Sequence, residues 1–423
     1  MSEAMTATGL DGKPFAGHGE CCPACGSAKL RSVYKKTGIP VNSCILMSTP
    51  QEAVGYPKGD IDLTFCEDCG FIYNKAFNEN HIQYSEKYEE TQGFSGTFNK
   101  FHQKLAQDII DRHGLHGKEV IEIGCGKGEF LAMICDMGEN KGVGFDPAYV
   151  ADRSIATKTD SAKFVVDFYS EKYADQDADL ICCKMTLEHI PLVQQFISMV
   201  RRAAGQRTET VVFFQIPEMT LILEERGFWD IYYEHCSYFT KGLKGSLATL
   251  FRRCGFDVKD VWVDYGDQYL MIEALPAEGA QPDPQGVSEE VAALSTLVDD
   301  FARDVTVNIA NWRASMAEWA RDGKKVVLWG SGSKAVSFLT SVGIQDELQY
   351  VVDINPNRHG YFMPGTGHEI VSPDFLAEYK PDVVVIMNPI YREEITASCR
   401  ERGLEPEIRT VLEPLGAGPA KAA

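Results

Sequence analysis

The sequence of 423 residues lacks several features that would each imply a class of protein. It has no apolar run near the roughly 18 residues of a membrane-spanning helix, so we expect no membrane partner. Basic residues are scarce, since 41 Lys and Arg against 61 Asp and Glu give a net charge of −20. Such a chain has no electrostatic basis for following a nucleic acid, although a local basic pocket for one small anion stays possible. Residues 1–19 lack the charged start and apolar core of a signal peptide, which predicts a cytoplasmic protein.

No tandem repeat is evident, and three blocks of different character predict three domains. Residues 1–75 contain two Cys-x-x-Cys pairs, residues 76–275 alternate between strand and helix patterns, and residues 276–423 open with a proline- and glycine-rich linker. In the second block, short apolar strands such as Glu119–Ile123 and Asp179–Cys183 alternate with amphipathic segments such as 98–112. This alternation predicts an α/β fold with a doubly wound parallel sheet.

The third block begins with a long apolar stripe at helical spacing, from Val291 to Trp319. The stripe predicts a long helix that packs either on its own chain or on a second subunit, so a monomer and a homodimer both remain open. Three apolar strands, 324–329, 348–352 and 382–387, follow with helical segments between them. They predict a second, smaller Rossmann-like unit.

The 13 cysteines are an odd number, and four of them form the two pairs, Cys22 with Cys25 and Cys66 with Cys69. This pattern favours a metal site over a disulfide framework. Four thiolates complete a tetrahedral Zn²⁺ site and leave no open position, so the zinc would be structural. Reduced thiols without metal are the alternative, and Cys21 and Cys44 are ligand candidates in a different register. The 40-residue gap between the pairs exceeds that of a zinc ribbon, so we expect an insertion that loops out.

A glycine-rich turn follows the strand at 119–123, with Gly124, Gly126 and Gly128 positioned for close approach of a ligand. Glu122 lies in the strand end, where a carboxylate would repel a diphosphate and suit a ligand with an amino group. The next strand ends at Asp146, where a carboxylate can accept hydrogen bonds from both hydroxyls of a ribose.

This pattern resembles the class I S-adenosylmethionine-dependent methyltransferases. The resemblance implies that Glu122, the three glycines and Asp146 bind the cofactor, and that Asp167 and Phe168 contact its adenine. The segment 179–190, with Glu188 and His189, looks like the family's fourth strand and the turn after it; whether the pair contacts the cofactor or only stabilises the loop stays open.

The order of zinc module, methyltransferase core and C-terminal Rossmann-like unit resembles the sugar C-methyltransferases that act on carbon 3 of nucleotide-linked keto-deoxysugars. The run Tyr232-Tyr-Glu-His-Cys-Ser-Tyr-Phe239 carries the resemblance most specifically. It implies catalytic or substrate-binding roles for Tyr232, Glu234 and His235, and a weaker one for Tyr88, because Glu90 stands where the family often has a further tyrosine.

Chemistry leads to the same histidine. Methylation of a carbon next to a ketone needs a base for a carbon-bound proton and a donor for the enolate oxygen. His235 is the natural base because an imidazole titrates near neutral pH, although a buried structural histidine is the alternative. O- or N-methylation of a sugar or small metabolite is the alternative reaction.

The C-terminal unit offers a site for the anionic part of such a substrate. Gly330, Gly332 and Lys334 follow its first strand and open a helix, and Asn388 follows its third strand. These loops meet at one edge of a parallel sheet, the usual ligand crevice. A Rossmann-like unit that binds nothing is the alternative.

Overall fold

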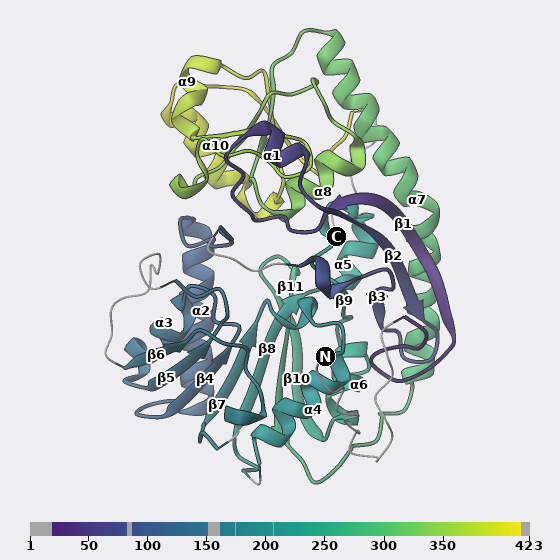
Figure 1. Cartoon of the computed structure of the whole chain (residues 1–423), viewed down its shortest axis with the longest axis vertical. Coiled ribbons are helices and arrows are strands. Elements are labelled where there is room, and N and C mark those ends of the chain that lie inside the picture. The colour runs from purple at the N-terminus through teal and green to yellow at the C-terminus, as the bar shows by residue number, and fades with distance from the viewer. Residues whose placement is uncertain (1–18, 83–86, 151–160, 174, 206, 416–423) are drawn as a thin grey trace.

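The computed structural model describes residues 19–82, 87–150, 161–173, 175–205 and 207–415, and it contains three sheets (Figure 1). The C-terminal sheet lies at one end of the long axis and a seven-stranded sheet at the other, while a four-stranded sheet runs along one side. Most of the N-terminal segment from which we expected a cytoplasmic protein lies outside the described residues. None of the described helices is both long and apolar enough to cross a membrane.

The seven-stranded sheet has the order β10-β11-β8-β7-β4-β5-β6. Five neighbouring strands are parallel, while β11 is antiparallel to β8 because a tight hairpin joins it to β10. The strands are β4 (Glu119–Ile123), β5 (Lys141–Phe145), β6 (Ala162–Val165), β7 (Leu180–Lys184), β8 (Val211–Pro217), β10 (Phe256–Asp264) and β11 (Tyr269–Pro276). The doubly wound fold is confirmed, with an antiparallel edge that the sequence pattern did not predict.

Helices cover both faces of this sheet, because its central strands are apolar on both sides. On one face, α2 (Gly96–His113) and α3 (Glu129–Gly138) enclose a core with Phe101 and Phe130. On the other, α4 (Val193–Ala203) and α6 (Ser246–Arg253) enclose a core with Phe214 and Phe251. The short α5 (Met219–Glu225) follows β8. The carboxyl ends of β4, β5 and β7 therefore meet at one edge, where ligands bind in such sheets.

The four-stranded antiparallel sheet, β1-β2-β3-β9, joins distant parts of the chain. Its strands are β1 (Leu30–Pro40), β2 (Lys58–Cys66), β3 (Ile72–Asn74) and β9 (Ser237–Tyr238). The insertion between the cysteine pairs, which we expected to loop out, is buried over residues 39–47, and α1 (Pro50–Val54) follows them. Its apolar side chains, such as Ile45 and Met47, are buried against the C-terminal unit.

The C-terminal unit begins with α7 (Val287–Arg321), a helix of 35 residues. Its apolar stripe packs on β1, α5 and α8 of its own chain through residues such as Phe301 and Trp312. A five-stranded parallel sheet, β14-β13-β12-β15-β16, follows. Its elements are β12 (Val326–Trp329), α8 (Ser333–Val342), β13 (Tyr350–Val352), β14 (Glu369–Val371), α9 (Leu376–Tyr379), β15 (Val383–Ile386), α10 (Arg392–Glu401) and β16 (Glu407–Thr410).

Candidate active site

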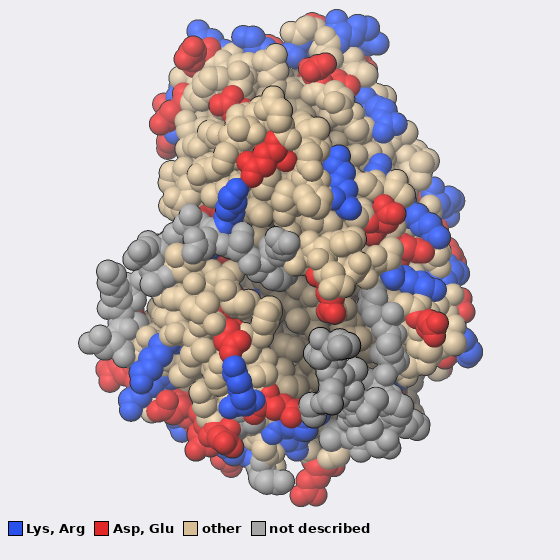
Figure 2. Space-filling view, viewed as in Figure 1, with Lys and Arg blue, Asp and Glu red and all other residues tan. Residues whose placement is uncertain are grey.

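A cavity of about 700 Å³ lies where the seven-stranded sheet and the C-terminal unit face each other. Figure 2 shows the surface hollowed between these two parts, with acidic and basic side chains interspersed around it. Its walls are the glycine loop after β4, the run 230–235, and the loops after β12, β13 and β15. The volume lies within the range of small-molecule sites.

The glycine loop cannot accommodate side chains where it turns. Gly124, Gly126 and Gly128 have φ values of +69°, +53° and +80°, a region that glycine adopts without strain. A Cβ on Gly124 would lie 2.0 Å from Oγ1 of Thr186, and one on Gly128 would lie 2.3 Å from the ring of Phe164. The loop backbone therefore packs closely against Thr186 and Phe164, and Gly124 and Gly126 line the cavity.

Two acidic side chains flank this loop. Asp146 accepts hydrogen bonds from the backbone N–H of Gly126 at 3.0 Å and of Ala148 at 2.7 Å, and burial raises its pKa. Glu122 is buried, and its Oε2 has no hydrogen-bond partner among the described residues. An unsatisfied buried carboxylate at the cavity fits a ligand that brings its own N–H donor.

Asp167 and Phe168 line the same end of the cavity. The carboxylate of Asp167 accepts hydrogen bonds from the Lys172 ammonium and the Tyr173 hydroxyl, while Phe168 is 66% exposed. An aromatic ring held open at the cavity mouth is suited to stacking on a flat ligand.

The four candidate catalytic residues lie together. The Tyr88 hydroxyl donates to Oε2 of Glu234 at 2.7 Å, and the backbone N–H of Ser43 donates to Oε1. The rings of Tyr232 and His235 lie 4.1 Å apart between centroids. His235, Tyr232 and Tyr88 all line the cavity, and the carboxylate of Glu234 holds Tyr88 and the buried insertion in place.

His235 is a neutral imidazole at pH 7. Its pKa lies well below the ordinary value, chiefly because it is buried, and also because His189 and Lys334 are close. The His189 ring lies 4.8 Å away, edge-on, and burial lowers the pKa of His189 to about 4. Burial raises the pKa of Tyr232 well above its ordinary value, so its hydroxyl stays protonated. The cavity therefore contains a proton acceptor beside a proton donor.

The C-terminal wall contains the other candidates. Gly330 has a φ of +106° and Gly332 precedes α8, and both line the cavity. The Lys334 ammonium donates to Oδ2 of Asp230 at 2.6 Å, a partner that the sequence did not suggest. Asn388 accepts from the Gln268 side chain at 3.0 Å, which joins this wall to the methyltransferase sheet.

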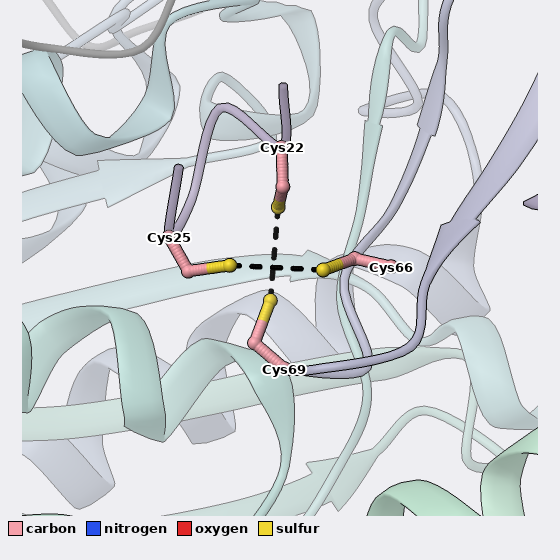
Figure 3. Close-up of side chains that lie close together, drawn as sticks. All are labelled: Cys22, Cys25, Cys66 and Cys69. Atoms are coloured by element: carbon pink, nitrogen blue, oxygen red, sulfur yellow. Dashed lines mark hydrogen bonds between the residues drawn. The ribbon is translucent and has the colours of Figure 1, made fainter. Parts of the chain in front are cut away.

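The four paired cysteines lie together in a separate cluster (Figure 3), and their side chains point to a common centre. The Sγ atoms of Cys22 and Cys69 are 3.7 Å apart, and those of Cys25 and Cys66 are 3.6 Å apart. Four thiolates at about 2.3 Å from a tetrahedral Zn²⁺ lie about 3.8 Å from one another. The geometry of the cluster therefore fits zinc. Cys21 and Cys44 are not part of it.

Two family models match the chain: a methyltransferase domain over residues 98–261 and a C-methyltransferase C-terminal domain over residues 287–405. The chain is also 25% identical over 397 residues to the C-methyltransferase NovU of Streptomyces niveus, a match that covers 90% of this chain and 92% of that protein. The chain is an S-adenosylmethionine-dependent methyltransferase, and it is similar to C-methyltransferases over most of its length.

Two solved methyltransferase structures match the chain over less than half of its length. The N,N-8-amino-8-demethyl-D-riboflavin dimethyltransferase RosA of Streptomyces davawensis has 19% identity and a TM-score of 0.33, and the match covers 43% of this chain and 56% of that chain. The 1,6-didemethyltoxoflavin-N1-methyltransferase of Burkholderia thailandensis, solved with S-adenosylhomocysteine, has 16% identity and a TM-score of 0.32, covering 44% of this chain and 83% of its own.

The resemblance stated from the sequence is thus confirmed at the level of family and enzyme class. The roles of individual residues stay predictions. Sequence reasoning missed several polar residues of this methyltransferase, among them Lys184, Asp230 and Ser43. Lys184 ends an apolar strand, and an isolated polar residue at the carboxyl end of a strand was the signal available for it.

Proposed function

We propose that this methyltransferase transfers a methyl group to the carbon beside the ketone of a nucleotide-linked keto-sugar. One observation carries the proposal: a buried, neutral imidazole, His235, lies beside the protonated hydroxyl of Tyr232 in the cavity that the glycine loop enters. Methylation of a hydroxyl needs only a base, whereas methylation of carbon also needs a donor for the enolate oxygen.

The residues of the loop fit the cofactor. Gly124, Gly126 and Gly128 leave room for its approach, Asp146 is placed for the ribose hydroxyls, and the unsatisfied Glu122 is placed for its amino group. Asp167 and the exposed ring of Phe168 are placed for the adenine. When bound, S-adenosylmethionine supplies an electrophilic methyl group on a sulfonium.

The mechanism assigns one task to each of these side chains. His235 accepts the proton from the carbon next to the ketone, and the Tyr232 hydroxyl donates a hydrogen bond to the carbonyl oxygen, where negative charge develops. Glu234, through its hydrogen bond to Tyr88, positions the tyrosine at the sugar. A base and a donor that are already in place remove the need for solvent reorganisation during proton transfer.

The C-terminal wall then receives the anionic part of the substrate. Gly330, Gly332 and Lys334 lie at the start of α8, where backbone N–H groups and a lysine attract a phosphate, and Asn388 borders the same crevice. Separately, Cys22, Cys25, Cys66 and Cys69 hold a structural Zn²⁺ ion.

The three separate sheets support the domain limits proposed from the sequence, near residues 75 and 276. The exception is β9, a strand of the second block that pairs with the sheet of the first block.

The test is replacement of the base. Glutamine roughly keeps the size and hydrogen bonding of histidine but cannot accept the proton, so His235→Gln should lower kcat by about 10²–10⁴-fold without loss of cofactor binding. Deuterium exchange at the ketone-adjacent carbon, measured with S-adenosylhomocysteine present, should occur in the wild type and be lost in the variant.

The exposed His116 provides a matched control, because His116→Gln makes the same chemical change outside the cavity. It should leave kcat and exchange unchanged. If His235→Gln exchanges and methylates at wild-type rates, the base lies elsewhere. If the wild type methylates its substrate on oxygen or nitrogen, C-methylation of a keto-sugar is wrong.

A further inference from the structure

Two buried side chains of opposite charge below the glycine loop lack a complete set of hydrogen-bond partners among the described residues. Glu122 on β4 and Lys184 at the end of β7 both line the cavity, and both lie on the face of the sheet that α2 and α3 cover. Their strands are direct neighbours in the sheet. The proposed mechanism gives Lys184 no task.

Lys184 differs from the other lysines of the cavity. Lys127 pairs with Glu90 at 3.5 Å and Lys334 pairs with Asp230, but Lys184 takes part in none of the ion pairs found among the described residues. Its ammonium instead contacts Nε2 of His102 and lies 3.8 Å from the centre of the Phe130 ring. Burial, and then the charge of Lys184, lower the pKa of His102 to about 2, so His102 is a neutral acceptor.

An ammonium has three N–H donors, and a neutral imidazole and an aromatic face do not neutralise its charge. Lys184 is only 9% exposed, so water reaches it little when the cavity is filled. Glu122 lacks a donor, because its Oε2 has no hydrogen-bond partner among the described residues. A buried charge in this state is costly unless a ligand completes it.

Burial also raises the pKa of Glu122 and lowers that of Lys184, and the charge of each side chain offsets only part of the shift of the other. A ligand group that carries one positive and one negative charge, separated by one carbon, would satisfy both. The α-amino acid end of S-adenosylmethionine is such a group.

We propose that Lys184, held by His102, binds the α-carboxylate of S-adenosylmethionine while Glu122 binds its amino group. The inference rests on the proposed cofactor site at the glycine loop. The amino acid end of the cofactor would then bind on the face of the sheet that α2 and α3 cover.

Calorimetry with two ligands tests this assignment without any turnover. The probes are S-adenosylhomocysteine and its decarboxylated analogue, which keeps the amino group. The wild type should bind the analogue about 10–100-fold more weakly, as the loss of a hydrogen bond between charged groups implies. Lys184→Gln keeps a donor for His102 without the charge, so it should bind the two ligands within about threefold of each other.

Lys104→Gln is the matched control, because Lys104 lies on α2 near His102 in the sequence but is exposed and paired with Asp108. It should keep the wild-type ratio of the two affinities. If Lys184→Gln also keeps that ratio, the carboxylate is bound elsewhere and the proposal is wrong.

If Lys184→Gln does not fold, a crystal structure of the wild type with S-adenosylhomocysteine decides. Nζ of Lys184 should then lie within hydrogen-bond distance, about 3.2 Å, of a carboxylate oxygen, and a separation beyond this range overturns the assignment. Loss of carboxylate discrimination in Lys184→Gln without deuterium exchange in the wild type would refute the proposed function alone.

Discussion

At the residue scale, three features of its surroundings act on the imidazole of His235. It is buried, it lies beside His189, and Lys334 is near enough to disfavour a second positive charge. All three favour the neutral ring. The proposed base is therefore unprotonated at neutral pH. A lowered pKa also makes it a weaker proton acceptor, so the proposed donor Tyr232 gains importance.

This lowered pKa predicts the position of the acid limb of the pH profile. A base that must be unprotonated loses activity as pH falls through its pKa, so kcat/KM for the sugar should stay near its plateau at pH 6.5 and fall only below that value. The profile should be measured at saturating S-adenosylmethionine. An acid limb centred at or above pH 6.5 would show that another group, or a solvated His235, is the base.

At the element scale, the four-stranded sheet next to the cysteine cluster connects to the segment 232–235, which contains the proposed catalytic residues. β2 ends at Cys66, β3 follows it, and β3 pairs with β9, which begins two residues after His235. A zinc ion in the cluster would thus support the strand that continues from the proposed catalytic residues. In this proposal the metal holds the sheet together and takes no part in the reaction.

Loss of one thiolate should therefore lower stability more than it alters chemistry. We expect about one zinc per chain, and Cys25→Ser should lose it and lower Tm by about 5–15 °C, with a smaller effect on kcat at low temperature. Metal analysis and thermal unfolding measure both. Cys21→Ser, which removes a neighbouring thiol outside the cluster, should change neither. A wild type without zinc would refute the site.

At the scale of the whole molecule, the cavity is lined by residues of both the methyltransferase sheet and the C-terminal unit, and hydrogen bonds join these two parts around it. The Tyr391 and Tyr265 hydroxyls are 2.6 Å apart, and Glu394 accepts from Thr97 Oγ1 at 2.6 Å. The Lys334–Asp230 pair joins the same two parts from inside the cavity. In the proposed function, substrate and cofactor therefore meet across a boundary between units.

Lys334→Ala should raise KM for the sugar nucleotide about tenfold or more and leave the Kd of S-adenosylhomocysteine unchanged. The variant removes the cation and also leaves the carboxylate of Asp230 unpaired beside an anionic substrate. Steady-state kinetics and calorimetry separate the two effects. Asp230→Asn keeps the cation, so its KM should stay near that of the wild type; an equal rise in both variants would indicate a structural pair only.

Local patterns were sufficient to predict part of this protein. The cysteine pairs, the glycine turn after β4 and the acidic end of β5 each depend on residues within a few positions of one another, because turn geometry and strand burial are local constraints. The alternation of elements likewise predicted the α/β class. The same reasoning predicted that the insertion between the cysteine pairs loops out, but nothing local revealed the surface of the C-terminal unit that buries it.

The amino-acid sequence by itself thus determined the family, the fold class and the motifs that point to the cofactor. Only the tertiary structure decided which side chains meet: Ser43 with Glu234 across 191 positions, Lys334 with Asp230 across 104, and Lys184 with His102 across 82. Such pairs follow from how separate elements pack, so their charge balance is invisible until the packing is known.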